Sequence, residues 1–169
     1  MFVARVPIII LAFAISGCQT VSSAFHFRAG TDALERGDYK LAAVELEKAR
    51  SDNPNWSKIR NNLGVAYARL GRHDEAWREF LAAIAVPPEN PGAIQNFEKY
   101  WGRFESEGVL AKGTPSENVL HRLGRPQIEI RCKSMAGAVL WLYGSKGLRF
   151  EENKLTEAGG MLTINLKPC

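Results

Sequence analysis

The feature that most constrains the fold is an internal repeat with a period of 34 residues. A shift by that period places Gly30 over Gly64 and Gly37 over Gly71. It also aligns further small, large apolar and proline residues: Ala42 with Ala76, Ala49 with Ala83, Leu46 with Phe80, Tyr39 with His73, and Pro54 with Pro88. Small residues let two helices cross closely, a large apolar residue fills the next space, and proline ends the second helix. The repeat therefore predicts two stacked helical hairpins.

The period and these positions resemble the tetratricopeptide repeat. The second copy fits best, with Leu63, Gly64, Tyr67, Ala76, Phe80, Ala83 and Pro88 in family positions. Next, Asn90 and Pro91 form a good helix start. The following helix, through about residue 103, has an apolar stripe of Ile94, Phe97, Trp101 and Phe104, and it places Glu98 where a third repeat would place glycine. We expect residues 25–107 to form two repeats plus a closing helix.

The resemblance implies a binding scaffold in which the first helix of each pair lines a concave groove. In this register the groove presents Phe27, Thr31 and Leu34, then Lys58, Asn61, Val65 and Arg69, then Gln95, Lys99 and Arg103. Asn62 matches one asparagine of carboxylate-clamp arrays, whose other positions do not match. The basic and polar lining predicts an acidic peptide segment or a terminal carboxylate as partner. The alternative is that these side chains form only a solvated helical face.

The last third of the chain changes character after Gly108–Gly113. Thr114 as a cap, Pro115 in the first turn and Glu117 in a capping box predict a short helix, which ends at Gly124 and Pro126. Residues 128–132 then alternate apolar and polar, which predicts a half-buried strand with Cys132 facing the core. Further strands are expected at residues 139–143, 148–151 and 161–166. The fold class is α+β, with helical hairpins followed by a small helix-plus-antiparallel-sheet domain over residues 113–169.

The order of short motifs in this domain resembles the SmpA/OmlA (BamE-like) family of small envelope modules. The motifs are Gly113-Thr114-Pro115-Ser116, Leu123-Gly124-Arg125-Pro126, Leu140-Trp141-Leu142-Tyr143, Leu148-Arg149-Phe150 and Asn153-Lys154-Leu155. The family's best-known member is an accessory subunit of the β-barrel assembly machinery. The resemblance implies an envelope location, and we expect Trp141 and Tyr143 to serve packing.

The N-terminus has the anatomy of a secretory signal: Arg5, an apolar run over residues 6–15, and small residues before Cys18. This run is too short to span a bilayer. The segment Ile15-Ser16-Gly17-Cys18 resembles the bacterial lipobox, which implies removal of residues 1–17, acylation of Cys18 and a linker over residues 18–24. Gln19 is compatible with sorting to the outer membrane. The alternative is an ordinary cleaved signal with an incidental cysteine.

The remaining cysteines, Cys132 and Cys169, are an even pair in an oxidising compartment, where a disulfide is permitted but not required. The formal charge of +4 comes without a Lys/Arg run, so nucleic acid is not an expected partner. The isolated His26, His73 and His121 lack the spacing of a metal site. We expect no metal, cofactor or small-molecule substrate, and no enzymatic activity.

These features predict a lipoprotein on the periplasmic face of the outer membrane, where its groove holds an envelope protein partner. The pathway would be envelope or outer-membrane protein assembly. The alternatives are an adaptor associated with peptidoglycan or with a secretion or pilus apparatus. The third class, an enzyme with a cryptic site in the C-terminal domain, lacks supporting residues.

Overall fold

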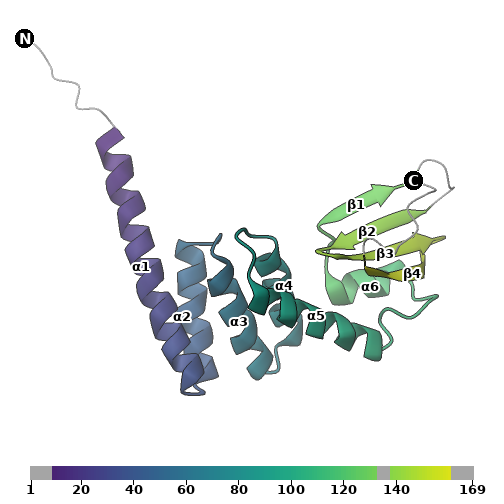
Figure 1. Ribbon diagram of the computed structural model, residues 1–169, viewed down its shortest axis with the longest axis horizontal. Coiled ribbons are helices and arrows are strands. Elements are labelled where there is room, and N and C mark those ends of the chain that lie inside the picture. Colours follow the sequence, from purple (N-terminus) through teal and green to yellow (C-terminus); the bar gives the residue numbers. More distant parts are fainter. Residues whose placement is uncertain (1–8, 133–137, 161–169) are drawn as a thin grey trace, which may run out of the picture.

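The computed structural model describes residues 9–132 and 138–160, with only the helical backbone described for residues 9–20. Five helices are followed by a short helix and a four-stranded sheet (Figure 1). The helices are α1 (Ile9–Glu35), α2 (Tyr39–Asp52), α3 (Ser57–Arg69), α4 (His73–Ile84), α5 (Pro91–Ser106) and α6 (Ser116–Leu123); the strands are β1 (Ile128–Arg131), β2 (Val139–Tyr143), β3 (Lys146–Glu151) and β4 (Lys154–Gly160). The predicted α+β class is confirmed.

The two glycines of the repeat register mark the places where paired helices cross. A Cβ atom at Gly30 would lie 2.6 Å from Cγ of Leu46, and one at Gly64 would lie 2.6 Å from Cε1 of Phe80. Such separations are far inside van der Waals contact, so both positions exclude any larger residue. In each hairpin, therefore, a glycine admits a large apolar side chain at the equivalent position of the partner helix, Leu46 in the first and Phe80 in the second, which is the physical basis of the 34-residue period.

The closing helix α5 begins as the sequence predicts and packs on α4. The side chain of Asn90 caps it by accepting a hydrogen bond from the Ala93 amide at 3.2 Å. Phe97, Trp101 and Phe104 are buried, but Ile94 is 40% exposed, so the predicted stripe is one residue shorter than expected.

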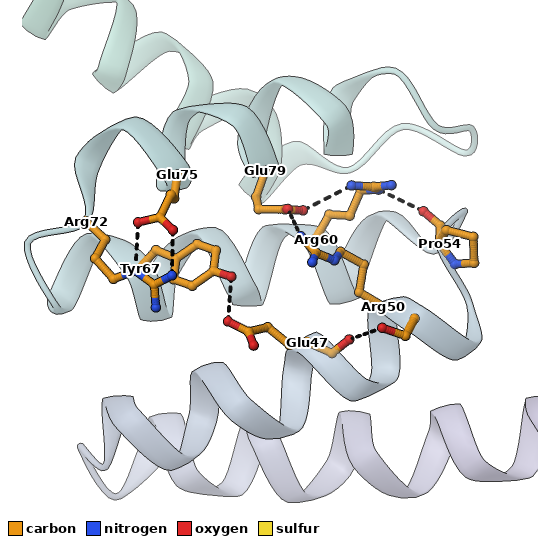
Figure 2. A network of polar contacts seen from close by, with 9 residues as sticks. Glu47, Arg50, Pro54, Arg60, Tyr67, Arg72, Glu75 and Glu79 are labelled. Carbon is orange, nitrogen blue, oxygen red and sulfur yellow. Dashed lines mark hydrogen bonds and ion pairs between the residues drawn. The ribbon is translucent and has the colours of Figure 1, made fainter.

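Polar contacts tie α2, α3 and α4 together (Figure 2). The buried Glu79 carboxylate accepts hydrogen bonds from Arg50 and Arg60, and Arg60 also donates through Nε to the Pro54 carbonyl at 2.7 Å. In the same view the Tyr67 hydroxyl donates to Glu47 at 2.7 Å. These bonds fix the second hairpin against the first at points where apolar packing alone would allow sliding.

The C-terminal strands form an antiparallel meander in the order β1-β2-β3-β4. Its core is continuous with that of the repeats, because one buried cluster includes Trp77 and Phe104 together with Leu123, Tyr143 and Leu148. Trp141 and Tyr143 are buried, as the sequence predicts.

Trp77 of α4 is the central residue of this junction. It is fully buried, stacks on Phe97 with ring centroids 5.2 Å apart, meets Phe104 edge-on, and donates from Nε1 to the Leu123 carbonyl at 2.8 Å. The sheet turn adds a contact at Gly144, where a Cβ atom would lie 2.5 Å from Cδ1 of Ile84. The unit formed by α6 and the sheet therefore packs on α4 and covers the apolar side chains at the end of the helical array.

Two local predictions in this unit are wrong. Thr114 does not cap α6: its hydroxyl donates to the Ala111 carbonyl at 2.7 Å, and Pro115 occupies the cap position without a side-chain bond. Strand β1 is not half-buried, since all four residues are exposed, including Ile128 at 53% and Ile130 at 38%. Among the described strands β1 pairs only with β2, so it is an edge strand of the sheet.

Of the three cysteines, only Cys132 has its side chain within the described part of the structure. Cys132 is half-buried and disulfide-bonded. Cys169 and the expected strand at residues 161–166 lie outside the described residues. The pairing of Cys132 with Cys169 therefore stays a prediction.

The N-terminal segment expected to be a linker is helical. Residues 18–24 continue α1 without a break, and the first turns of α1 project beyond the other helices (Figure 1). None of the helices in the described ranges is long and apolar enough to cross a membrane. Cleavage before Cys18 and its acylation stay predictions.

Candidate functional site

The candidate site is a pocket of about 440 Å³ between α3, α4 and α5. Its lining comes from three helices: Val65, Ala68 and Arg69 of α3, His73 and Phe80 of α4, and Asn96, Lys99, Tyr100 and Arg103 of α5. The lining residues of α3 and α5 recur at spacings of three or four and those of α4 at seven, which puts the residues of each helix on one face. One face of each of the three helices therefore lines the same pocket.

The floor of this pocket is apolar and fixed. Phe80 is buried and packs on Tyr100 with ring centroids 5.3 Å apart. The Tyr100 hydroxyl lies 3.0 Å from Nδ1 of His73, and burial raises the pKa of Tyr100 above its ordinary value. The phenol therefore stays neutral over the physiological range and offers a hydrogen bond beside an apolar surface.

The rim of the pocket is cationic. Arg69 and Lys99 are exposed, and neither has an ion-pair partner among the described residues; the Arg69 guanidinium lies 5.8 Å from the centre of the Tyr39 ring. Arg103 is paired with Glu107 at 2.6 Å, and this contact lowers the pKa of the Glu107 carboxyl. No carboxylate is among the lining residues. Two unpaired cations over an apolar floor are suited to an acidic side chain or a carboxylate next to an apolar one.

The structure brings together four of the residues predicted to bind a peptide: Val65, Arg69, Lys99 and Arg103. It places the other four elsewhere. Asn61 accepts a hydrogen bond from the Asn96 side chain at 2.9 Å, and Asn62 donates to the Thr31 hydroxyl at 3.2 Å, so both asparagines join helices. Gln95 is exposed outside the lining, and Lys58 lines a different pocket.

Sequence reasoning missed five lining residues: Ala68, His73, Phe80, Asn96 and Tyr100. Asn96 could have been found, because it stands three residues before Lys99 on the same helical face. His73 and Tyr100 become part of the site only through the crossing of α4 and α5, for which the sequence carries no local signal.

The described part of the chain also bears on metal binding. No group of three or more His, Cys, Asp or Glu side chains there is placed to hold an ion.

Comparison with known proteins agrees with this architecture. Residues 27–94 match the tetratricopeptide repeat family model. A TPR repeat-containing protein of Pseudomonas aeruginosa is 38% identical over 61 residues, which cover 36% of this chain and 25% of that protein. Residues 27–94 are thus similar to tetratricopeptide repeats, a class of scaffold that binds protein partners.

Two further relatives are similar to part of this chain. Photosystem I assembly protein Ycf3 of a Synechococcus strain is 28% identical over 90 residues, covering 49% of this chain and 51% of that protein. A protein O-mannosyl-transferase of Caenorhabditis elegans is 29% identical over 77 residues, covering 46% of this chain but 11% of that protein. The chain spans about half of these relatives or less. The repeats point to a non-catalytic scaffold.

Proposed function

We propose that this chain is an outer-membrane lipoprotein whose repeats act as a non-catalytic scaffold in envelope or outer-membrane protein assembly. The observation that carries the scaffold role is the pocket between α3, α4 and α5, with the unpaired Arg69 and Lys99 over an apolar floor. Its partner is an envelope protein that presents an acidic segment. The name of the cyanobacterial relative, a photosystem I assembly protein, is in line with an assembly role.

The location rests on the N-terminal sequence. The lipobox-like run Ile15-Ser16-Gly17-Cys18 supports acylation of Cys18, and two or three acyl chains anchor a protein stably. Gln19 supports transfer to the outer membrane. The α6 and four-stranded sheet unit is of the kind expected from the SmpA/OmlA resemblance, which supports an envelope setting.

Charge reversal at the pocket tests the scaffold role. The double variant Arg69→Glu/Lys99→Glu replaces both unpaired cations with carboxylates, so capture of the partner from detergent-solubilised envelopes should fall at least about tenfold, the size of a 1.4 kcal/mol loss. The matched control Lys40→Glu/Arg78→Glu makes the same charge change at exposed positions outside the lining and should retain capture. Equal capture by both double variants would contradict the proposal.

The anchor and the pathway are tested separately. The intact mass of the chain purified from membranes should show loss of residues 1–17 and addition of acyl chains, and Cys18→Ala should abolish both changes. An unmodified N-terminus would refute the lipoprotein assignment. Co-sedimentation with purified peptidoglycan sacculi would favour a cell-wall adaptor over an assembly scaffold.

A further inference from the structure

A second pocket, of about 500 Å³, shares no lining residue with the pocket between α3, α4 and α5. It is bounded by Ser23 and Ala24 of α1, by the turn between α2 and α3, and by the turn between α4 and α5. The two turns lie along one edge of the helical array (Figure 1). The volume is in the range of small-molecule binding sites, so this edge can take a ligand of its own.

The walls of this second pocket are apolar and held in place. They are formed by the Trp56 ring and by three proline rings, those of Pro87, Pro88 and Pro91. Trp56 is half-buried and packs on Phe27 of α1, with ring centroids 4.6 Å apart. Proline rings restrict the backbone that carries them, so the turn between α4 and α5 offers a rigid apolar surface. An apolar side chain of a ligand can pack here without first ordering the walls.

The start of α3 makes one corner of the second pocket attractive to a carboxylate. Ser57 and Lys58 line this corner, and α3 has no side-chain cap. The amides of Ile59 and Arg60 donate to the Trp56 carbonyl, but those of Ser57 and Lys58 have no acceptor among the described residues. The Lys58 side chain is exposed and forms no ion pair in that part of the chain. Free amides at a helix N-terminus beside a lysine favour a bound anion.

A buried hydroxyl on α1 points to a ligand independently of the helix start. Ser23 lines the second pocket at 1% exposure, and its Oγ forms no hydrogen bond with any described residue. Buried hydroxyl groups in folded proteins are nearly always hydrogen-bonded, because one left unpaired destabilises the fold. A polar group of a ligand in this pocket gives Ser23 the partner that the protein does not supply.

The second pocket also contains a carboxylate. Glu89, in the turn between α4 and α5, is exposed and forms no ion pair with Lys58 or with any other described residue. Lys58 and Glu89 are the two ionisable side chains among the lining residues. Glu89 disfavours a simple anion and Lys58 disfavours a simple cation, whereas a zwitterion complements both. Since the two side chains are not in contact, a ligand with separated charges fits best; at about 3.3–3.6 Å per residue, an extended tripeptide is about 10 Å long.

We propose that this second pocket binds a short peptide with free termini. The peptide carboxylate lies at the start of α3 beside Lys58, its ammonium group lies beside Glu89, and an apolar side chain packs on Trp56. The site is independent of the lipid anchor and of the pocket between α3, α4 and α5. The array then carries two sites, one for a protein partner and one for a small peptide.

Isothermal titration calorimetry of the full chain with the tripeptide Ala-Phe-Ala tests this assignment. Three forms of the peptide are compared: both termini free, the N-terminus acetylated, and the C-terminus amidated. Each block removes one charge, so each blocked form should bind at least about tenfold more weakly than the free form. No binding of the free form, or equal affinity of the three forms, would overturn the proposal. A loss on amidation without a loss on acetylation would show a simple anion site and would overturn it as well.

Two variants assign the peptide termini to their partners. Lys58→Gln should weaken binding of the free peptide and remove the effect of amidation, and Glu89→Gln should do the same for acetylation. The matched controls Lys40→Gln and Glu117→Gln make the same changes at exposed positions outside this pocket and should bind as the parent chain does. Equal losses in the variants and the controls would contradict the assignment.

Two further variants separate this site from the rest of the molecule. Ser23→Ala should weaken peptide binding without lowering the melting temperature, because the hydroxyl it removes has no partner among the described residues. Arg69→Glu/Lys99→Glu should leave peptide binding unchanged, and the Lys58 and Glu89 variants should leave partner capture unchanged. Peptide binding that is lost in Arg69→Glu/Lys99→Glu would assign the peptide to the pocket between α3, α4 and α5 and would overturn the proposal.

Discussion

The helical array and the sheet unit use their side chains in opposite ways. The array leaves Arg69 and Lys99 without ion-pair partners at the rim of an open pocket, whereas the sheet unit turns Trp141, Tyr143 and Phe150 inward. Lys146, the first residue of β3, pairs with Glu98 of α5 at 2.7 Å. The contrast indicates that the array is the surface for partners and that the sheet unit completes and stabilises the end of the array.

The largest expected effect concerns the junction between these regions. Trp77→Ala removes a fully buried indole and leaves the Leu123 carbonyl without its donor, so the free energy of unfolding should fall by about 3–5 kcal/mol. Urea denaturation followed by circular dichroism measures this loss. The control Trp77→Phe keeps an aromatic ring but not the Nε1 hydrogen bond. A loss in Trp77→Ala no larger than in Trp77→Phe would show that the aromatic core does not join array and sheet.

A smaller effect is expected inside the array, at the helix crossing of the second repeat. Gly64→Ala places a methyl group 2.6 Å from the Phe80 ring, and the overpacking should cost about 1–3 kcal/mol of unfolding free energy. Gly102→Ala is the matched control, because a Cβ atom there meets nothing within 4 Å, and it should stabilise the chain by about 0.5–1 kcal/mol. Destabilisation by both substitutions would remove the support for close crossing as the origin of the period.

The smallest effect depends on pH. Burial, with help from the hydrogen bond to Glu47, raises the pKa of Tyr67 to about 12, against about 10 in an unfolded chain. A raised pKa means that the folded state holds this proton more tightly. The contribution of Tyr67 to stability is therefore fully present below about pH 10 and is lost as the pH rises toward 12.

Tyr67→Phe tests this dependence. The variant lacks the hydroxyl bond to Glu47 and should be about 1 kcal/mol less stable than the parent chain near pH 8. Since phenylalanine cannot ionise, the difference should shrink between pH 10 and 12, as measured by denaturation at a series of pH values. A difference that stays constant over that range would contradict the assigned cause.

Much of the array could be predicted from the sequence, because its structure repeats a local rule. Gly30 and Gly64 mark equivalent helix crossings in the two hairpins, and Asn90 caps α5 as the sequence predicts. The sheet unit was predicted less well. Alternation at Ile128 and Ile130 can indicate which residues share a face, but it cannot indicate whether anything covers that face.

The site shows the same division between local and distant causes. The place of Arg69, Lys99 and Arg103 in the pocket lining could be predicted from the helical register, because the register is a property of each helix alone. Lys58 and Gln95 satisfy the same register but lie outside the pocket, because the hollow extends only along the part of α3 that faces α5 and α4. That extent is set by packing between elements far apart in the chain.

Site-specific photo-crosslinking in intact cells tests the central claim most directly. A photoreactive residue at Gln95, which is exposed one turn before Lys99 and outside the lining, leaves the pocket itself unchanged. The control is the same residue at the exposed Ile128 of β1. The account predicts a discrete crosslinked envelope protein from position 95, lost when Arg69→Glu/Lys99→Glu is added, and none from position 128. A discrete product from position 128 alone would contradict the assignment of partner binding to the array.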